Sequence, residues 1–398
     1  MKCAVIGGGA AGLMAACALV RGGVQVDVLE RQPRVGKKLL ATGNGRCNFT
    51  NMNMGPQHYY GSFLDMPEFL EKFTPERIMD EFAAMGVPGV ADEQGRVYPM
   101  SNAAASVLDV LRLTLSEYGG GELTGFDVSE IRHGRTFNVR SADGRTGKYD
   151  RVIIACGGKA APKSGGCDGG YRLLRGLGHN ITGLRPAIAP VNTDVTDLKG
   201  LKGIRVRCNV TLRDGDNDIC RESGEVLFAD YGLSGICIMQ LARRVHGLKR
   251  PVISIDLVPG MKEAYLFEHI RNLADRRLED VLNGMLQRRL GWNVLRAAGI
   301  ADLSRTAGSL SRREISAVYR KLTDFSVSVD SVCGMESAQV TAGGADMSEF
   351  DPVTLESRIV PGLYAVGEVC DVDGDCGGYN LHWAWASALA AAEGILNG

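Results

Sequence analysis

The sequence predicts an α/β fold: a Rossmann-like domain of the glutathione-reductase type, with an inserted β-rich domain that carries a small helical subdomain. Three observations support this prediction. The first thirty residues read as strand, glycine-rich turn, helix and strand. Beyond Pro186 the pattern becomes that of antiparallel strands and then of helices. After residue 335 the apolar, glycine-containing character of the first part returns, so we expect both chain ends to form one domain.

The predicted domains follow these changes of pattern. Residues 1–190 and 335–398 form the discontinuous Rossmann-like domain, residues 191–260 and 323–334 the β-rich insert, and residues 261–322 the helical subdomain. The predicted strands are 2–6, 24–30, 126–133, 136–141, 149–158, 204–214 and 224–235. The predicted helices are 11–20, 67–86, 102–118, 261–300, 311–322 with Ser311 and Glu314 at capping-box spacing, and about 381–396.

Composition excludes several classes of protein. Of 398 residues 45% are hydrophobic and 23% charged, which is typical of a globular protein, and the net charge of −1 favours neither nucleic acid nor an anionic membrane as partner. Residues 191–334 carry a modest basic excess, for which a solvated helix surface is favoured over an anion-guiding patch. We expect no signal peptide and no membrane span. Eleven cysteines without a CxxC pair favour reduced thiols and a cytoplasmic location, with no metal site.

The N-terminal motif Gly7-x-Gly9-x-x-Gly12 predicts dinucleotide binding, because it lies between a strand and a helix. The first glycine permits a tight turn, the second lets backbone approach a pyrophosphate, and the third lets the helix pack on the strand. Glu30 ends the second strand at the spacing expected of an acid that bonds a ribose hydroxyl.

The segment after the second strand favours FAD over NAD. Instead of another helix and strand, a long polar stretch follows, which includes GKKLLATGNGRCN. Such a segment suits a long cofactor that the chain follows from pyrophosphate to flavin. Lys38 is placed to meet phosphate charge, Gly43 allows close backbone approach, and Asn44, Arg46 and Asn48 are donors for the polar edge of the flavin.

A second signature lies near the C-terminus. A predicted strand delivers Gly367 and Glu368, and two glycines and Asn380 precede the last helix, whose N-terminus favours negative charge. Glu368 or Asp371 is expected to hold ribityl hydroxyls. A calcium loop built from Asp371, Asp373 and Asp375 is the weaker interpretation, because it lacks the distal glutamate of an EF-hand.

Five motifs together resemble the BaiN/aminoacetone-oxidase-like FAD flavoproteins: GGGAAG, KKLLATGNGRCNFTN, IIACGGKAAPKSGGCDGGY, GEVLFADYGLSG and ESRIVPGLYAVGEVCDVDGDCGGYNLHWAWAS. The resemblance covers the whole chain and implies FAD as cofactor. Members are assigned to reduction of unsaturated steroid or bile-acid ketones and to oxidation of aminoacetone. Cys376, His382 and Ala388 depart from the family pattern beside the flavin edge, as does the segment Gly343-Gly344-Ala345. The expected cofactor contacts are Gly7, Gly9, Ala10, Ala11, Gly12, Glu30, Arg31, Lys38, Gly43, Asn44, Arg46, Cys47, Asn48, Val128, Ala155, Gly157, Gly367, Glu368, Asp371, Gly378, Tyr379 and Asn380.

The expected catalytic residues are Tyr379, Asn48 and Arg46. Tyr379 is the first candidate for hydrogen-bond donor or acid, with ring packing as an equal alternative, and Arg46 and Asn48 would bind the carbonyl or the flavin. His382 is a weaker candidate as proton source, since a packed helix histidine is the favoured interpretation. Redox-active thiols at Cys47, Cys370 or Cys376 are disfavoured by their spacing.

The predicted function is an FAD-dependent oxidoreductase that reduces an unsaturated, steroid-like ketone by hydride transfer from flavin N5. NADH or NADPH would act as a transient electron donor, because no second dinucleotide motif with strand context is present. An aminoacetone-type amine oxidase that uses oxygen, and a non-catalytic flavin-binding redox sensor, stay open as alternatives. We expect a small-molecule substrate and no nucleic-acid partner, and the oligomeric state is left open.

Overall fold

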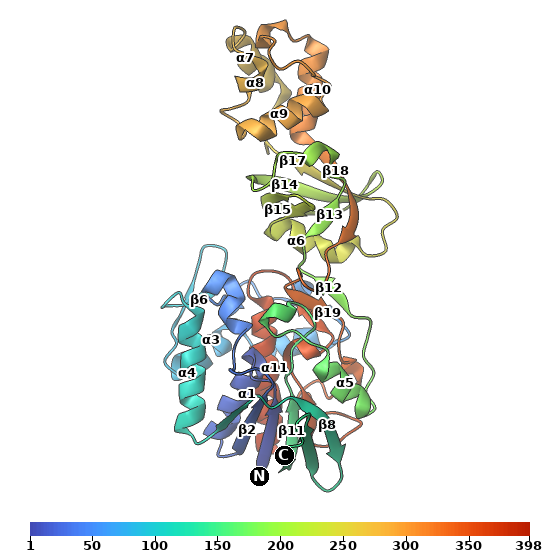
Figure 1. Cartoon of the computed structure of the whole chain (residues 1–398). Coiled ribbons are helices and arrows are strands. Elements are labelled where there is room, and N and C mark those ends of the chain that lie inside the picture. Colours follow the sequence, from blue (N-terminus) through green and yellow to red (C-terminus); the bar gives the residue numbers. More distant parts are fainter. The chain divides into compact units, whose positions relative to one another are not determined.

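The chain folds into two compact units in a computed structural model that describes all 398 residues (Figure 1). Unit 1 comprises Met1–Arg185 and Gln339–Gly398, and unit 2 comprises Pro186–Ala338. The first unit is therefore built from both chain ends. The unit boundaries lie close to the residues 190 and 335 at which the sequence pattern changes.

The centre of unit 1 is a five-stranded parallel sheet, as the strand–helix–strand pattern predicts. Its order is β20-β11-β1-β2-β7, with β1 in the middle. The strands are β1 (Lys2–Ile6), β2 (Gln25–Glu30), β7 (Gly121–Thr124), β11 (Arg151–Ile154) and β20 (Leu363–Ala365). Parallel strands that are covered on both faces read as continuous apolar runs, and β1 and β11 do so. The carboxyl ends of β1 and β2 lie at one edge, where a ligand is expected to bind.

Helices α1 (Ala10–Arg21) and α11 (Tyr379–Asn397) pack against each other beside this sheet (Figure 1). Both are apolar on nearly every side, so they are buried within the unit. The last helix, predicted to begin at about residue 381, begins two residues earlier. Helix α11 begins at Tyr379, because Gly378 in the left-handed region (φ 104°) ends the preceding loop directly before it.

The helix predicted over residues 67–86 is two helices, α2 (Met66–Lys72) and α3 (Pro75–Ala84). Thr74 stops the first and caps the second: its side chain accepts a hydrogen bond from the backbone N–H of Arg77. Pro75 occupies the first helical position, where its missing N–H costs nothing. The prediction of α4 (Ala104–Glu117) agrees closely with the structure.

Smaller elements complete unit 1. Strands β8 (Val128–His133), β9 (Phe137–Ser141) and β10 (Thr146–Tyr149) form an antiparallel sheet, and β3 (Thr50–Asn51), β6 (Arg96–Pro99) and β5 (Gly89–Ala91) form another. A two-stranded ribbon joins β4 (Tyr59–Gly61) to β21 (Val372–Gly374), which lie far apart in the sequence. The remaining elements are α5 (Gly169–Gly176), β19 (Val340–Ala342) and 3₁₀ segments at Leu39–Gly45, Pro56–His58, Pro162–Ser164, Met347–Glu349 and Gly367–Val369.

Unit 2 contains a closed antiparallel barrel, which confirms the predicted β-rich insert. The strand order is β13-β16-β15-β14-β17-β18. The strands are β13 (Val191–Thr193), β14 (Arg205–Asp214), β15 (Asn217–Ala229), β16 (Gly232–Ser234), β17 (Pro251–Asp256) and β18 (Phe325–Val332), with β12 (Arg185–Ala187) before them and helix α6 (Ile236–Leu241) beside β15. Closure pairs every strand edge within the barrel.

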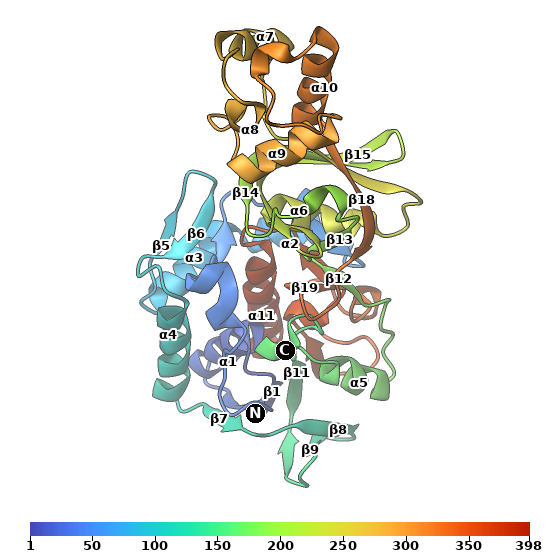
Figure 2. The same cartoon turned by 45° about the horizontal axis from the view of Figure 1, so that its top comes forward.

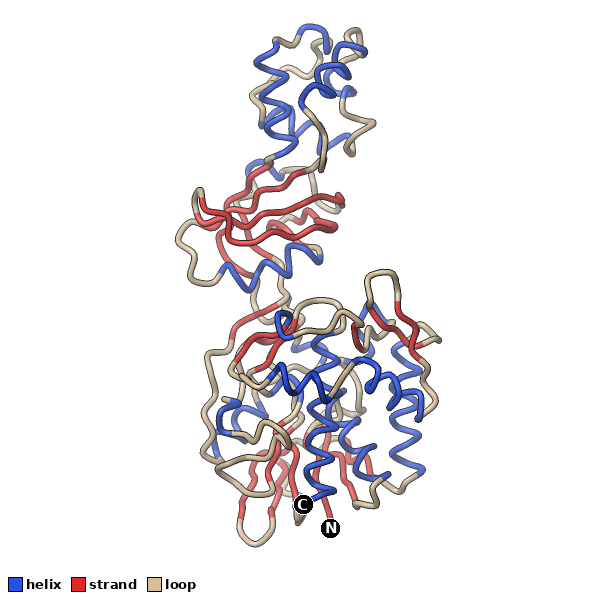
Figure 3. Tube along the Cα trace, turned by 180° about the vertical axis from the view of Figure 1, so that it is seen from behind, coloured by secondary structure: helices blue, strands red, loops and turns tan.

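Four helices follow β17 and lead back into β18, as the sequence predicts for residues 261–322. They are α7 (Glu263–Asn272), α8 (Leu278–Val281), α9 (Arg288–Ala297) and α10 (Arg312–Thr323). Figure 2 shows them grouped apart from the barrel strands, and the helix and strand colours of Figure 3 separate the same two parts of unit 2. The predicted capping box is present: Ser311 and the Glu314 side chain bond each other's backbone N–H groups.

None of the helices combines the length and the apolar character that a bilayer-spanning segment needs.

Candidate functional site

The glycine turn between β1 and α1 has the geometry that its spacing predicts. Gly7 adopts φ 110°, and a Cβ there would lie 2.4 Å from the carbonyl oxygen of Ala155. A Cβ at Gly12 would lie 1.9 Å from the carbonyl oxygen of Gly7. At Gly9, by contrast, a Cβ would meet nothing within 4 Å. Two of the glycines are thus needed for packing within the chain, whereas the backbone at Gly9 faces open space.

Glu30 stands at the end of β2 beside this turn. Its carboxylate accepts hydrogen bonds from the backbone N–H groups of Gly8 (2.8 Å) and Gln32 (2.7 Å). These bonds fix the carboxylate next to the start of α1, where an adenosine ribose would follow a pyrophosphate. The neighbouring Arg31 side chain donates to the carbonyl oxygen of Gly165 at 2.8 Å.

Three further expected contacts lie near the ends of strands. Ala155 follows β11 and donates its N–H to the carbonyl of Ile6 at the end of β1. Gly157 has φ 70°, and a Cβ there would meet nothing within 4 Å. Val128 is the first residue of β8 and is 8% exposed. The structure thus brings Ala155 beside the glycine turn.

Lys38 and Glu368 are 330 residues apart in sequence and form an ion pair at 2.6 Å. The other oxygen of Glu368 accepts the backbone N–H of Thr341 at 3.0 Å. The pair is partly exposed, with 32% of the lysine side chain and 19% of the glutamate accessible. The structure therefore unites one residue of the flavin-approach motif with one of the C-terminal motif, and the lysine charge is matched by a carboxylate within the chain.

The flavin-approach segment has an unusual backbone at Asn44 (φ 56°) and Cys47 (φ 61°). Left-handed conformations at non-glycine residues cost energy and are often found at ligand sites. Arg46 is exposed; its guanidinium lies over the ring of Tyr98, 4.5 Å from the centroid, and its Nε donates to the carbonyl of Gly43 at 3.3 Å. The Cys47 thiol is fully buried, and burial raises its pKa to about 12. A thiol of this kind is protonated and unreactive at neutral pH.

Asn48 is the most informative residue of the segment. It is 9% exposed, and its Oδ1 atom is buried without a hydrogen-bond partner. A buried acceptor without a partner costs roughly 1–3 kcal/mol, so such atoms are rare in folded proteins. A Cβ at Gly378 would lie 2.9 Å from this oxygen, which places Asn48 beside the start of α11. A hydrogen-bond donor from a ligand would satisfy it.

Tyr379, the first residue of α11, is packed rather than free. It is 6% exposed, its ring stacks on that of His58 (4.3 Å between centroids), and its hydroxyl donates to the carbonyl of Asn53 at 3.4 Å. Burial raises its pKa. The contacts support the alternative of ring packing with a structural hydroxyl more than that of an acid.

Asn380 stabilises the loop before α11. Its side-chain amide accepts a hydrogen bond from the N–H of Gly374 and donates to the carbonyls of Gly374 and Asp375.

Asp371 lies directly before strand β21, and Asp373 within it, so the segment is not the open loop of a calcium site. Asp371 is 8% exposed, and burial raises the pKa of its carboxyl. Hydrogen bonds with Ser62 and Thr182 act in the opposite direction and lower that pKa. Its backbone N–H donates to Ala345. Asp375, directly after the strand, accepts hydrogen bonds from His58 (3.0 Å) and Tyr60 (3.1 Å).

The His382 side chain is packed in the core, as the favoured interpretation of its position predicts. Its ring is 0% exposed, Nδ1 bonds the hydroxyl of Thr50 (2.8 Å), and Nε2 lies 2.9 Å from the carbonyl oxygen of Phe73. Burial lowers the pKa of His382 to about 4. Cys370 is equally buried, and burial raises its pKa. Both residues are part of the packed core beside α11.

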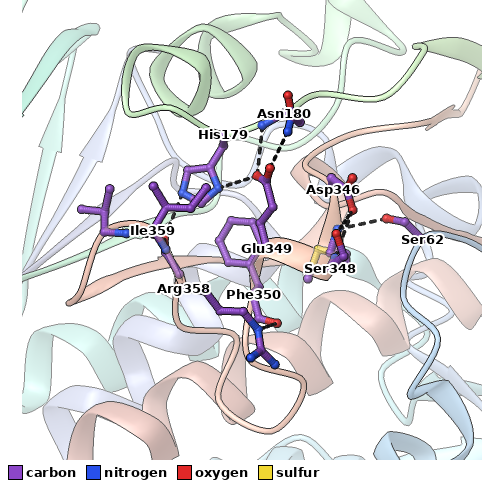
Figure 4. Close-up of polar contacts among 12 residues, drawn as sticks. Ser62, His179, Asn180, Asp346, Ser348, Glu349, Phe350, Arg358 and Ile359 are labelled. Atoms are coloured by element: carbon purple, nitrogen blue, oxygen red, sulfur yellow. Dashed lines mark hydrogen bonds and ion pairs between the residues drawn. The ribbon is translucent and has the colours of Figure 1, made fainter.

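A polar cluster that the sequence analysis missed joins the loop after α5 to the segment before β20 (Figure 4). His179 bonds Glu349 through Nδ1 and the hydroxyl of Ser357 through Nε2, both at 3.0 Å. This order of side chains resembles a catalytic triad, but Ser357 also accepts the backbone N–H groups of Ile359 (3.0 Å) and Val360 (2.8 Å). With both lone pairs and its proton engaged, and the residue 5% exposed, the hydroxyl is structural.

These residues fit FAD. The open backbone at Gly9, the carboxylate at the end of β2 and the unpartnered acceptor of Asn48 are three independent features that a ligand would complete. The turn at Gly7–Gly12 and the start of α1 would hold the pyrophosphate, and Glu30 the adenosine ribose. The start of α11 and Asn48 would hold the flavin edge.

Comparison with known proteins places the chain in a family. The sequence model described as "HI0933-like protein Rossmann domain" matches residues 1–394. A 3-dehydro-bile acid delta(4,6)-reductase of Clostridium scindens is 34% identical, covering 98% of this chain and 97% of the relative. A ribosomal RNA dihydrouridine synthase of Escherichia coli is 30% identical with the same coverage.

Among solved structures, a 3-ketosteroid delta1-dehydrogenase of Sterolibacterium denitrificans matches with a TM-score of 0.50. The two sequences are 13% identical, and 99% of each chain is covered. This likeness concerns the fold.

Proposed function

Because the chain belongs to the HI0933-like family of Rossmann-domain proteins and is an FAD-dependent oxidoreductase, we propose that it reduces a carbon–carbon double bond conjugated to a carbonyl group. The observation that carries the proposal is the full-length similarity to two relatives whose names describe this chemistry. A 3-dehydro delta(4,6) bile acid and the uracil ring of uridine both contain such a bond. The proposal is therefore the reaction that the two relatives share, and the two substrates are tested separately.

The first proposed substrate is a steroid-like unsaturated ketone, in line with the 34% identical relative. When bound, FAD supplies a hydride from N5, and NADH or NADPH restores it. The protein holds the substrate carbonyl with hydrogen-bond donors and delivers a proton to the carbon next to it. Arg46 lies in the flavin-approach segment and is exposed, and it is the proposed hydrogen-bond donor to the substrate carbonyl. Asn48 and Tyr379 are proposed to position the flavin, because both are buried.

Product analysis tests the proposal. The purified yellow protein is incubated with a 3-oxo-4,6-diene steroid acid and NADH or NADPH deuterated at C4, and the products are analysed by mass spectrometry. We expect a saturated product two mass units heavier than the diene for each bond reduced, with a third unit where deuterium reaches carbon through the flavin. Unchanged diene alongside rapid oxygen-dependent oxidation of aminoacetone would establish the amine oxidase instead. No turnover of any substrate would favour the redox sensor.

The second candidate substrate is uridine in RNA, which one observation favours besides the relative's name. The helical part of unit 2 carries exposed arginines that make no ion pair within the chain, in contrast to Arg277 and Arg288, which pair with Glu279 and Asp280. These arginines include Arg271, Arg276, Arg296, Arg313 and Arg320. Unpaired cations on a helical surface are available to bind phosphate. The expectation that the protein has no nucleic-acid partner stays a prediction. Substitutions of these arginines test it.

The test uses ribosomal RNA transcribed in vitro, so that every uridine is unmodified. If RNA is the substrate, the protein with NADPH forms dihydrouridine, and Arg271→Glu with Arg313→Glu weakens RNA binding at least about tenfold, with a smaller salt dependence. Arg132→Glu is the matched control, since Arg132 is exposed on β8 and already pairs with Glu130. RNA binding that is absent, or that Arg271→Glu with Arg313→Glu weakens no more than Arg132→Glu does, would leave the steroid-like ketone as the proposed substrate.

A further inference from the structure

His58 and Asp375 form a pair that the proposed reaction does not yet use. His58 ends the 3₁₀ turn before β4, and Asp375 directly follows β21. Because β4 and β21 pair with each other, residues 317 positions apart in sequence meet at the end of one ribbon. The backbone N–H of Asp375 donates to the carbonyl of His58 at 2.9 Å, which extends the ribbon by one further bond. Both side chains are thus placed by paired backbone.

The side chains have the arrangement of a histidine–carboxylate proton-transfer pair. The Nδ1 atom of His58 lies 3.0 Å from Oδ2 of Asp375, and the hydroxyl of Tyr60 donates to Oδ1 of the same carboxylate at 3.1 Å. A carboxylate accepts only from Nδ1–H, so the bond fixes the ring tautomer and leaves Nε2 to exchange protons. Nε2 makes no hydrogen bond within the chain, and 27% of the side chain is exposed. The carboxylate of Asp375 is the charged group bonded to His58, and the titratable ring of Tyr379 stacks on it.

The pair lies beside the proposed flavin edge. The His58 ring stacks on Tyr379 at an interplanar angle of 20°. Tyr379 follows Gly378, the residue next to the unpartnered oxygen of Asn48. The Asn380 amide also bonds the carbonyl of Asp375, which fixes the loop to α11. The same few residues therefore hold both the imidazole and the start of the helix.

We propose that His58 is the proton donor of the reduction and that Asp375 positions it; this rests on the function proposed above. The hydride that the bound cofactor supplies forms the C–H bond at the β carbon, and the π electrons of the double bond move towards the carbonyl. The Nε2–H bond of protonated His58 breaks, and its proton forms the C–H bond at the α carbon. The neutral imidazole then takes a proton from water through its exposed edge. For a uracil ring the proton would go to C5.

The test separates the two half-reactions in the holoprotein. Protein reduced anaerobically with dithionite is mixed with a 3-oxo-4,6-diene steroid acid or, in a second series, with unmodified RNA, and flavin re-oxidation is followed. We expect His58→Gln to slow this step about 10²–10³-fold and Asp375→Asn about tenfold, and added imidazole to restore part of the His58→Gln rate. Flavin reduction by NADPH and re-oxidation by oxygen should change less than about twofold. His133→Gln is the control and should behave as the wild type, because His133 is exposed and its ring contacts that of Phe137 in unit 1.

Several results would overturn the proposal. Wild-type re-oxidation rates in His58→Gln would do so, as would equal slowing of both half-reactions without rescue by imidazole, which is what a structural role produces. If His58→Gln fails to bind FAD, the pH profile of Asp375→Asn decides: a profile unchanged from that of the wild type overturns the pair. A wild-type protein that reduces neither acceptor contradicts the proposed function itself, and that result is distinct from the failure of the pair.

Discussion

At the residue scale, the glycine motif offers a matched pair of substitutions. Gly9→Ala should leave the free energy of unfolding of the FAD-free protein nearly unchanged, because the added methyl meets nothing within 4 Å, but should weaken FAD binding at least about tenfold. Gly12→Ala should instead destabilise the fold by about 3 kcal/mol, because its methyl would overlap the Gly7 carbonyl. Flavin titration and urea unfolding measure the two effects. Equal FAD affinity for Gly9→Ala and wild type would place the cofactor elsewhere.

A second residue-scale prediction concerns the unpartnered oxygen of Asn48. Asn48→Ala should weaken FAD binding about fivefold to tenfold without lowering the stability of the FAD-free protein, because no bond within the chain is lost. Asn51→Ala is the control: its amide bonds Gly377 and the N–H of Asn53, so the substitution should lower the melting temperature. Loss of stability in Asn48→Ala, with unchanged FAD affinity, would contradict the assignment of this oxygen to the cofactor.

For the candidate site, sequence alone predicts local backbone geometry better than contacts between distant residues. The spacing of Gly7, Gly9 and Gly12 was sufficient, because short-range motifs carry their geometry with them. Neither the Lys38–Glu368 pair nor the His58–Asp375 pair could be predicted, since each joins residues more than 300 positions apart. The burial that makes Tyr379 a packed ring likewise depends on His58 and Tyr59, which come from another part of the chain.

At the scale of elements, helix α11 is anchored by a neutral histidine, which gives a prediction of pH dependence. Because burial lowers the pKa of His382 to about 4, the unfolded chain binds a proton more readily than the folded one. Stability should therefore be complete above pH ~6.5 and fall, by on the order of 3 kcal/mol, as the pH drops towards 4. His179, whose pKa burial also lowers, should add a loss of the same sign.

Urea unfolding at a series of pH values measures this loss. In His382→Gln the part of the pH dependence due to His382 should disappear, although the variant is less stable at pH 8 because it fits the bonds to Thr50 and Phe73 less well. The same slope between pH 6.5 and 4 in variant and wild type would show that the histidine is not the source.

The capping box of α10 allows a prediction for unit 2. Ser311→Ala removes the acceptor for the Glu314 N–H and should destabilise the helix by about 1 kcal/mol, whereas Ser311→Asp should keep most of that stability. Circular dichroism during thermal unfolding measures the effect, and the visible flavin spectrum should be unchanged in both variants. A loss of stability in Ser311→Asp as large as that in Ser311→Ala would refute the capping role.

Element types were easier to predict than element ends. Strands β1 and β11 and helix α11 are buried on nearly every side, so their sequences are apolar throughout. That composition is visible in the sequence and predicts the type of each element. The predicted and observed ends differ where a single residue sets the end of a helix. Thr74 divides α2 from α3, and Gly378 makes α11 begin two residues before the predicted start. Such caps act through single hydrogen bonds or single dihedral angles, which periodicity does not register.

At the scale of the whole molecule, unit 2 is inserted between the two parts of unit 1, and both parts contribute residues to the candidate site. The first part of unit 1 supplies the glycine turn, Glu30 and Asn48, and the second part supplies Glu368, Asp375 and the start of α11. The return of the Rossmann-like pattern after residue 335 predicted this closure from sequence. Substrate identity could not be predicted in the same way, because relatives with names as different as a bile-acid reductase and an RNA-modifying enzyme match the chain over the same length.

The most direct test of the central claim, an FAD-dependent reduction of a conjugated double bond, is anaerobic. The protein is mixed with NADPH or NADH while flavin absorbance is recorded, and the reduced protein is then offered a 3-oxo-4,6-diene steroid acid, unmodified RNA, air or buffer alone. We predict bleaching by a nicotinamide and recovery that one of the two conjugated acceptors accelerates far beyond buffer. Bleaching by aminoacetone but by neither nicotinamide, followed by recovery in air alone, would contradict the claim.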